Sequence, residues 1–433
     1  MRGSHGVFKR LRTLTAFMLV FALVAAACGD DDDDVDAAPT TEPPATTEAA
    51  PEPAPEPSPD PEPEPEPVAE EPEPVADEPE PEPVAEEPAV EEAMAFTDVC
   101  PAKIVVQTNW FPEAEHGGTY QVIGPEGVID GENGTYSGPL ADTGLELEIR
   151  AGSLFIGFQP VTSVMYQDPD IFFGYVDGGE SVQQSGANPT IAVMVNLEIS
   201  PLAMLWDPGT YDFTSIEDIR DEGVTVLHFD PSVSIEYFVE TGQLSPGQLD
   251  ASFDGSPAAF LASNGGIVFQ SFATNAPSLY ENVIADWGKP LDYLLTHDFG
   301  WTQYQSPLVV RPDTITDYRD CLAMLIPVFQ QGWIDYMNDP VPMNNRILEI
   351  VEAQATFWSL SEQLNADAIT VMRDLDIVSN GPDDTFGNFD MDRIQTLIDQ
   401  IAPVFIEAGA NVKEGLQAED IATNEFIDPS IGF

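Results

Sequence analysis

The sequence predicts an α/β protein of two lobes, preceded by a long N-terminal segment without globular character. Residues 99–433 are numerous enough for two lobes. Along them, short apolar runs typical of strands alternate with helix-like segments, which favours an α/β fold. One strand, Lys103–Trp110, ends abruptly at a polar loop.

The end of that first strand is the most informative junction in the chain. The run Ile104–Val106 is typical of a buried strand. The loop after it carries Asn109, Trp110, Glu115 and His116, and a Gly-Gly pair follows. Ligands of open α/β folds lie beyond the carboxyl ends of the strands, and glycine lets a backbone approach a ligand closely. The sequence therefore predicts a small-molecule site here.

The other elements follow in order from the same patterns. We expect strands at Leu145–Ile149, Thr190–Asn196, Leu202–Trp206, Val224–Leu227, a short run ending at Phe253, and Leu308–Val310. Two stretches, Asp170–Gln184 and Ile267–Tyr280, each read as a strand that runs into a helix. Helices are expected after the capping residue Ser215, at Val233–Thr241, and from Thr316 onwards, including Ile347–Phe357 and Ile394–Phe405. The Gly-rich stretch Gly124–Gly144 is interpreted as a surface loop rather than a lid.

The first 28 residues are typical of a bacterial export signal. Four bases precede the apolar run Leu14–Val24, which is too short to span a membrane. Ala25–Cys28 resembles a lipobox, in which the cysteine becomes the lipid-modified N-terminus. An ordinary cleavable signal is the alternative. We expect an exported protein, anchored through Cys28 to the outer face of the bacterial cytoplasmic membrane.

Residues 29–98 predict a disordered acidic tether. They contain 26 acids and no base, with repeated Pro-Glu-Pro and few large apolar residues. Such a segment cannot bury enough surface to offset the entropy of ordering. A Pro-rich, self-repelling chain extends by about 3.1 Å per residue, so it could hold a domain on the order of 200 Å from its anchor.

The folded part is itself strongly acidic. The whole chain has 76 acids and 14 bases; without the signal and the tether, 50 acids and 10 bases remain. This balance argues against nucleic acid and anionic membranes as partners. It indicates a salt-rich habitat, where ions screen the self-repulsion.

We therefore expect molar salt to stabilise the protein. The urea midpoint of the purified mature chain should rise between low salt and molar sodium chloride, because screening weakens repulsion among surface carboxylates. Equal midpoints in the two buffers would contradict the inferred habitat.

Two of the three cysteines are predicted to pair. If Cys28 carries lipid, Cys100 and Cys321 remain in an oxidising compartment. We predict a disulfide between them, which would join the start of the folded part to a distant helix. Two buried free thiols are the alternative.

Several motifs, in order along the chain, resemble the substrate-binding proteins of ABC importers. They are Asn109–Tyr120 (Asn-Trp-Phe-Pro-Glu-Ala-Glu-His-Gly-Gly-Thr-Tyr), Asp177–Glu180, Val193–Trp206, Ser271–Leu279, Tyr304–Arg311 and Ala422–Phe426. The most similar branch contains binders of thiamine pyrimidine precursors, of riboflavin-type compounds, and of nitrate, sulfonates and taurine. One departure is Ala276, where the family often has Glu, which puts an aminopyrimidine ligand in doubt.

The resemblance implies a type II periplasmic-binding-protein fold, with two α/β lobes joined by two strand-like crossings. Lobe 1 would comprise residues 99–195 and 300–433, and lobe 2 residues 196–299. The ligand would lie between the lobes, and hinge closure would signal to the permease and ATPase of the importer. We expect a monomer without a cofactor.

The expected ligand contacts come from both lobes. Trp110 would stack on the ligand unless it belongs to the core, and His116 would either hydrogen-bond a ring atom or cap the next helix. The full set is Asn109, Trp110, Glu115, His116, Tyr120, Asp177, Gly179 and Glu180 in lobe 1, with Phe229, Asp230, Ser232, Asn264, Gln270 and Asn275 in lobe 2. Asp177 and Glu180 are also favourable helix-start residues whether or not they touch a ligand.

These loops favour a flat heterocycle that is neutral or cationic. Free anions need Arg, Lys or exposed helix N-termini, and only Arg150 and Arg311 fall near the expected cleft. A thiamine pyrimidine precursor or a riboflavin-like compound therefore fits better than nitrate, a sulfonate or taurine, which are the alternative.

The remote alternative is an enzyme of the same fold that makes a thiamine pyrimidine from its own histidine and pyridoxal phosphate. It would need a Schiff-base lysine, and Lys103, Lys289 and Lys413 fall outside the expected cleft loops. The histidines also lack zinc spacing, and no nucleophile-elbow or phosphate-loop motif occurs in the sequence. We expect a binding protein.

Overall fold

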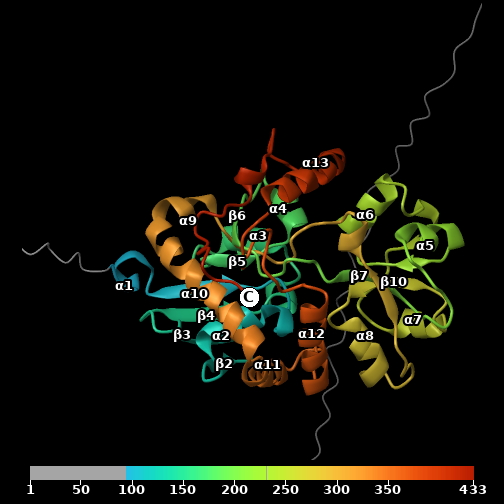
Figure 1. The fold of residues 1–433 in the computed structure, drawn as a ribbon, viewed down its shortest axis with the longest axis horizontal. Coiled ribbons are helices and arrows are strands. Elements are labelled where there is room, and N and C mark those ends of the chain that lie inside the picture. Colours follow the sequence, from blue (N-terminus) through green and yellow to red (C-terminus); the bar gives the residue numbers. More distant parts are fainter. Residues whose placement is uncertain (1–93, 231) are drawn as a thin grey trace, which may run out of the picture. The chain divides into compact units, whose positions relative to one another are not determined.

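Two β-sheets organise the folded part of the chain, which a computed structural model describes for residues 94–230 and 232–433 (Figure 1). The expected signal, the lipidation site Cys28 and most of the tether lie outside the described residues. The tether was predicted to end at residue 98, but helix α1 already begins at Phe96 and runs to Val99. Within the described part, no helix is both long and apolar enough to cross a membrane.

The first sheet has seven strands and forms lobe 1. Their spatial order is β2 (Val128–Asp130), β3 (Thr135–Pro139), β4 (Glu146–Arg150), β1 (Lys103–Gln107), β5 (Phe173–Tyr175), β12 (Leu308–Val310) and β6 (Ile191–Met194). Strand β1 runs parallel to β4 and β5, whereas β12 is antiparallel to β5 and β6. The buried run Ile104–Val106 explains the position of β1, because a central parallel strand is covered on both faces.

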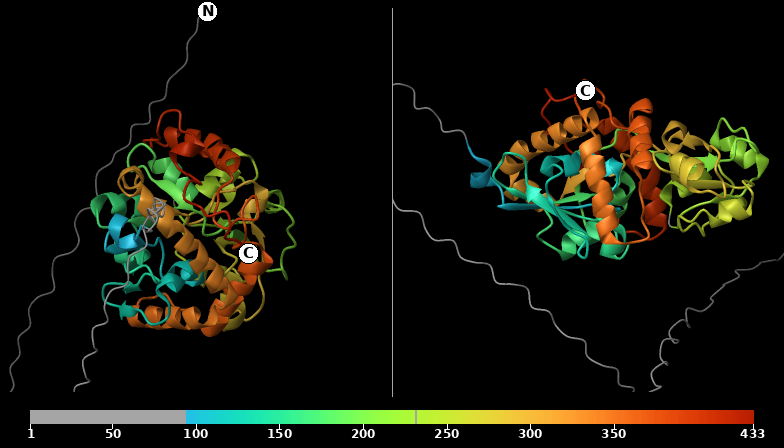
Figure 2. Two further views of the ribbon diagram at one scale, coloured as in Figure 1. Left: turned by 60° about the vertical axis from the view of Figure 1, so that its left-hand side comes forward. Right: turned by 90° about the horizontal axis from the view of Figure 1, so that it is seen from below.

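Helices cover lobe 1 on both sides of its sheet. Ile104 and Val106 share a core with helices α2 (Gly117–Ile123), α10 (Arg319–Asn338), α11 (Val341–Gln354) and α12 (Glu362–Asp374). Val105 points the other way and shares a core with α3 (Val161–Gln167), α4 (Gly178–Gln184) and α13 (Met391–Glu407). Figure 2 shows α10 and α11, in orange, along one side of lobe 1. Short helix α9 (Pro312–Asp317) leads from β12 towards α10.

The Gly-Gly pair after the first strand serves helix packing, not the approach of a ligand. A Cβ on Gly117 would lie 2.0 Å from the ring of Tyr336, and one on Gly118 would lie 2.1 Å from the ring of Trp333. Both aromatic residues belong to α10. The glycines therefore let α2 lie directly against α10, which corrects the interpretation drawn from the sequence.

Lobe 2 is built on the second sheet. The strand order is β11 (Asp292–Leu295), β7 (Leu202–Trp206), β10 (Val268–Phe272), β8 (Val226–Leu227) and β9 (Leu249–Asp250). Its helices are α5 (Ile216–Glu222), α6 (Val233–Glu240), α7 (Ala258–Ala262) and α8 (Ala276–Ser278), and a π-helical turn at Leu279–Val283 continues α8. Ser215 caps α5 as predicted, because its Oγ accepts a hydrogen bond from the backbone of Asp218. The strand expected to end at Phe253 ends at Asp250 instead.

The Gly-rich stretch Gly124–Gly144 is not the surface loop that the sequence indicated. It forms the hairpin β2–β3, and β3 pairs antiparallel with β4, so the stretch extends the sheet by two strands. Tyr136 on β3 is fully buried, and its hydroxyl donates to the Gly124 carbonyl at 2.6 Å. This anchoring in the core also argues against a lid.

Two crossings connect the lobes and are tied to each other. The first leads from β6 to β7 and the second from β11 to β12, and Leu197 forms an antiparallel bridge with Gln305 between them. Asn196 donates to the Ser306 carbonyl at 2.6 Å, and the Ser200 hydroxyl donates to Gln305 Oε1 at 3.1 Å. In the order β4-β1-β5-β12-β6, strand β12 returns from lobe 2 and lies between β5 and β6. A returning strand at this position is the arrangement of the type II periplasmic-binding-protein fold.

Cys100 and Cys321 form the predicted disulfide, with their Cα atoms 5.0 Å apart. Cys100 follows α1, and Cys321 is fully buried in the first turn of α10. The bond therefore fixes the start of the folded part to the longest helix of the described residues.

Candidate functional site

Asn109, Asp177 and Ser306 form a polar group at the carboxyl edge of the first sheet. Asn109 Nδ2 donates to Ser306 Oγ at 2.8 Å, and Asp177 Oδ1 accepts from the backbone N–H of Ser306 at 2.9 Å. Ser306 lies on the second crossing with φ of 50°, a left-handed conformation that costs energy in a serine. The loops after β1 and β5 are thus joined to the hinge.

Glu113, Glu115 and His116 form a second polar group, in and just before the 3₁₀ turn η1 (Ala114–His116). The side chain of His116 is 2 % exposed, and its Nε2 lies 3.9 Å from Glu113 Oε1, beyond hydrogen-bond range. The ring meets Tyr175 edge-on at 5.1 Å. His116 occupies the N-cap position of α2, yet its side chain makes no capping bond. Burial lowers the pKa of His116 to about 3, so the imidazole is neutral.

Lobe 2 presents its polar residues where β10 ends and α6 begins. Gln270 donates from Nε2 to the hydroxyls of Ser232 and Ser234, at 3.0 and 2.8 Å. Thr274 follows β10 and donates its hydroxyl to Glu115 Oε1, a bond that joins lobe 2 to lobe 1. Asn275 stands next to it at the start of α8, again without a capping bond. Lobe 2 therefore meets the predicted residue Glu115 of lobe 1 through Thr274, the neighbour of the predicted Asn275.

Trp110 lies in an aromatic cluster between the two lobe-1 loops that follow β1 and α11. Its ring meets Phe111 and Trp358 edge-on, at 5.6 and 5.9 Å. Trp358 stacks on Phe111 at 5.8 Å and donates from Nε1 to the Pro112 carbonyl at 3.2 Å. Trp110 is only half-buried, so the cluster fixes its ring and leaves part of it open for stacking.

Four predicted contacts serve the fold in this structure. Tyr120 is 1 % exposed in the core of lobe 1. The Gly179 N–H donates to Gln303 Oε1 at 3.1 Å, and Glu180 Oε1 accepts two hydrogen bonds from Thr162, at 3.0 and 2.8 Å. Asn264 precedes β10 and therefore lies at the opposite edge of the sheet from Thr274.

The two remaining lobe-2 candidates differ in their surroundings. Phe229 packs against Phe253, with ring centroids 4.7 Å apart, and so belongs mainly to the core of lobe 2. Asp230 is exposed and precedes α6. Neither makes a hydrogen bond to lobe 1 among the described residues.

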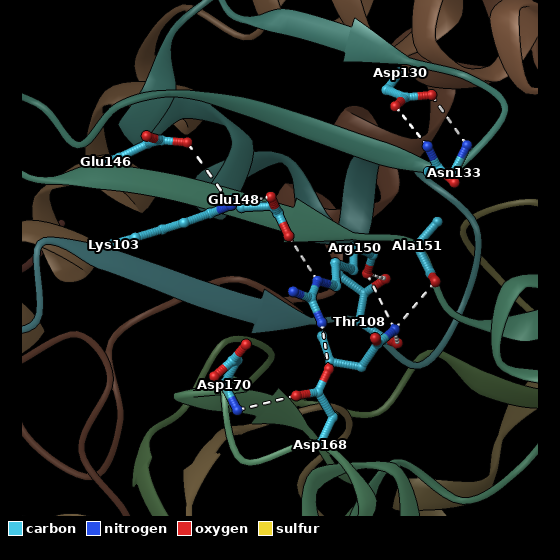
Figure 3. Close-up of polar contacts among 11 residues, drawn as sticks. Lys103, Thr108, Asp130, Asn133, Glu146, Glu148, Arg150, Ala151, Asp168 and Asp170 are labelled. Atoms are coloured by element: carbon cyan, nitrogen blue, oxygen red, sulfur yellow. Dashed lines mark hydrogen bonds and ion pairs between the residues drawn. The ribbon is translucent and has the colours of Figure 1, made fainter.

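Both bases expected near the cleft are engaged elsewhere. Figure 3 shows the Arg150 guanidinium between Glu148 and Asp168, with Lys103 and Glu146 nearby on the face of β1 and β4. The Arg150–Glu148 and Arg150–Asp168 distances are both 2.7 Å. Arg311 donates to the carbonyls of Met165 and Ile171, both at 2.9 Å. Neither guanidinium is free to bind an anionic ligand.

Sequence reasoning missed Glu113, Thr274 and Ser306 as site residues. Glu113 stands in the same motif as Glu115 and could have been chosen from that proximity alone. Thr274 precedes the chosen Asn275 by one residue. No sequence pattern marks Ser306 as a site residue. It reaches Asp177 because the second crossing returns from lobe 2 at this point and Ser306 adopts a left-handed backbone conformation.

Two cavities in the described part lie away from η1. One, of about 190 Å³, lies between α6 and α13 and is lined by Val233, Tyr237, Glu240, Thr241, Gln400, Ile401 and Val404. The other, of about 20 Å³, lies beside the start of α4 and holds one water at most. Neither is lined by the polar residues of η1.

Buried acids without basic partners predict that stability falls as pH rises from about 4.5 to 7. Burial raises the pKa of Glu113, Glu115 and Asp177, and it raises that of Glu180 to about 7. In this window the folded state binds more protons than the unfolded state, so the free energy of unfolding decreases with pH. Acids with a lowered pKa, such as Asp207, lose their contribution only below about pH 4.

Urea unfolding of the mature chain at constant ionic strength measures this slope. The substitution Glu180→Gln should make the slope shallower, since it removes one of the groups that take up a proton on folding. A midpoint that rises steadily from pH 5 to 7 would contradict the assignment.

Comparisons with known proteins find likeness only among solved structures. No protein-family model and no curated protein matches the chain. The alkanesulfonate-binding protein SsuA from Xanthomonas axonopodis pv. citri, bound to MOPS, has 9 % identity and a TM-score of 0.47; the match covers 75 % of this chain and 99 % of that one. The periplasmic aliphatic sulphonate binding protein SsuA from Escherichia coli has 10 % identity and a TM-score of 0.49, covering 72 % and 96 %. The Candida albicans CA3427 product, which has the generic periplasmic binding protein fold, has 11 % identity and a TM-score of 0.44, covering 75 % and 97 %.

Proposed function

We propose that the chain is the extracytoplasmic solute-binding component of an ABC importer. It would capture a small, flat heterocyclic metabolite between its lobes, of the thiamine-pyrimidine-precursor or riboflavin-like class, and deliver it to a membrane permease. The observation that carries the proposal is the Glu115–Thr274 hydrogen bond, which brings the polar strand ends of the two sheets together.

The hinge supports this proposal. Two crossings tied by the Leu197–Gln305 bridge give the lobes a shared pivot. The lobes also meet through the hydrogen bond that Ser278 on α8 donates to Asp367 on α12, at 2.5 Å. A protein of this build can trap a small molecule by rotating one lobe against the other.

The lysines of the folded part support binding over catalysis. Lys289 pairs with Asp207 at 2.7 Å and lies over the ring of Trp287, Lys413 pairs with Asp420, and Lys103 pairs with Glu148. All three are held by acids away from His116, so none is available there for a Schiff base.

Ligand screening combined with a shape measurement tests the proposed function. A metabolite library that contains thiamine pyrimidines, flavins, nitrate, sulfonates and taurine is screened against the mature chain by native mass spectrometry and thermal shift. Small-angle scattering then compares the free and bound protein. A heterocycle that binds and makes the protein more compact is the expected result. Binding of taurine or nitrate alone would overturn the ligand class, and binding of nothing in the library would overturn the function.

The N-terminal residues complete the proposal. Lipidation of Cys28 would anchor the protein to the outer face of the cytoplasmic membrane, with residues 29–98 as a tether to the binding lobes. Mass spectrometry of the membrane-extracted protein should find a lipid on Cys28, and Cys28→Ala should release the protein into the medium. A soluble wild-type protein with an unmodified N-terminus would contradict the anchor.

A further inference from the structure

Two polar atoms that follow β1 lack hydrogen-bond partners. Asn109 Oδ1 and His116 Nδ1 are buried, and neither has a hydrogen-bond partner among the described residues. No hydrogen bond from those residues reaches the carboxylate of Glu113, whose side chain is 18 % exposed. Among side chains of residues 94–230 and 232–433, Glu115 accepts a hydrogen bond only from the hydroxyl of Thr274 in lobe 2. Buried acceptors without donors are rare in native proteins, and a bound ligand is one way to satisfy them.

No base of the folded part compensates the two carboxylates. Nine of its ten bases pair with acids other than Glu113 and Glu115: Lys103, Arg150, Arg220, Lys289, Arg311, Arg319, Arg346, Arg393 and Lys413. The tenth, Arg373, donates to the Met337 carbonyl. His116, the nearest titratable nitrogen, is neutral because burial lowers its pKa. His116 Nε2 lies 3.9 Å from Glu113 Oε1, and no base of the described part pairs with either acid. Burial without a positive partner raises the pKa of both acids, and a bound cation would favour their ionised form.

We propose that the solute is a small organic cation, with an ammonium or amidinium group held by Glu113 and Glu115. This inference rests on the proposed function and specifies its ligand class. An ammonium group has three donors and no acceptor, and an amidinium group is likewise donor-only, so either one complements a set of unpaired acceptors. Charge-assisted hydrogen bonds to carboxylates are also the strong ones. Asn109 Oδ1, on the loop after β1, is a further buried acceptor without a donor among the described residues.

An organic cation fits better than a metal ion. Among residues 94–230 and 232–433, no group of three or more His, Cys, Asp or Glu side chains is arranged to hold a metal. The half-buried ring of Trp110, one loop away, adds a face on which the organic part of a cation can stack. A sulfonate would instead place negative charge beside two uncompensated carboxylates.

Probe sets of matched shape and different charge test this inference. Benzamidine, benzamide and benzenesulfonate share a ring, and butylamine, butanol and butanesulfonate share an aliphatic chain. Binding of each to the mature chain is measured by ligand-observed NMR and thermal shift. The cation of each set should bind more tightly than its neutral partner, and the sulfonates should not bind. Glu113→Gln and Glu115→Gln should each weaken the cation about ten- to a hundredfold, the usual effect of losing a charged hydrogen-bond partner.

The substitution Glu180→Gln is the matched control. Glu180 is also an acid without a basic partner, but its carboxylate accepts two hydrogen bonds from Thr162. The preference for cations should therefore persist in Glu180→Gln. Without ligand, the double variant Glu113→Gln/Glu115→Gln should be at least as stable as the wild type, because it removes two acids that lack a basic partner. This comparison tests the missing positive charge independently of any ligand.

Three outcomes would overturn the inference: tighter binding of the sulfonates, a cation preference that survives in the double variant, or no binding of any cation. A sulfonate that binds and makes the protein more compact would support the proposed binding function and contradict the inference that the ligand is a cation. Failure of the whole metabolite library would remove both.

Discussion

Loss of the Cys100–Cys321 disulfide is expected to reduce the free energy of unfolding by up to about 5 kcal/mol. The bond spans a sequence separation of 221 residues, from the end of α1 to the first turn of α10. In the chain-entropy model, a cross-link over so long a loop removes much of the freedom of the unfolded chain, and the model gives roughly 5 kcal/mol. Few other single bonds in a domain of this size have an effect as large.

Urea unfolding with and without reductant measures this effect. Cys100→Ala/Cys321→Ala should match the reduced wild type and should not respond to reductant. An Ellman assay on denatured, unreduced protein should find no thiol from this pair. Two free thiols, or equal unfolding midpoints with and without reductant, would contradict the expectation.

The disulfide has a mechanical consequence at the same place. Helix α1 has only four residues, and none of them is fully buried, so packing alone holds it weakly. Cys100 follows α1 directly and is bonded to the buried Cys321 of α10. Any pull from the N-terminal side is therefore transmitted to the core of lobe 1 instead of peeling β1 from the sheet.

Most strands of the fold could be predicted because buried strands are continuous runs of apolar residues in the sequence. Ile104–Val106 and Leu202–Trp206 are continuous apolar runs, and both form strands that are buried on two faces. Strand β11 was missed because Asp292–Leu295 has only two aliphatic residues, and its pairing with β7 is a tertiary event. The hairpin β2–β3 was missed for a similar reason, since Gly-rich loops and short edge strands share the same composition.

The site could be predicted only in part. Asn109, Glu115 and His116 all lie on the segment that follows β1, and the end of a buried strand can be predicted from sequence. The glycines at 117 and 118 were assigned the wrong role, since the aromatic rings that they admit come from a helix more than 200 residues later. Ser306 and Thr274 reach the site through the hinge and through lobe 2, and no local pattern reports such contacts.

Arg393 is expected to control both the stability of the hinge and the attachment of α13. Its guanidinium donates to Glu198 Oε1 at 2.8 Å and to the Glu198 carbonyl at 2.9 Å, on the first crossing. It also donates to the Thr302 carbonyl at 2.6 Å, on the second crossing, and lies 3.8 Å from the ring centre of Tyr304. One side chain of lobe 1 thus holds both segments about which the lobes would rotate.

Replacement of Arg393 by Met should reduce the free energy of unfolding by about 3 kcal/mol, at the low end for a broken buried pair because both side chains keep some exposure. Most of the loss comes from leaving the Glu198 carboxylate without a partner. Lys413→Met breaks an ion pair that is far more exposed and should cost less than about 1 kcal/mol. The double variant Arg393→Met/Glu198→Gln should recover part of the loss, since it removes the stranded charge.

The pH dependence of the Arg393→Met loss separates this ion pair from simple packing. Burial raises the pKa of Glu198 to about 7, and Arg393 opposes that rise, so removing Arg393 should raise the pKa further. At pH 5 the lone carboxyl is protonated and the loss should be small. At pH 8 the wild type keeps an ionised pair. In the variant, Glu198 must either be ionised without a partner or stay protonated at a pH that favours ionisation, and both cost free energy. The loss should therefore grow as pH rises from 5 to 8 in urea titrations. A loss that is the same at both ends would show that Arg393 acts through packing on Tyr304 and not through its charge.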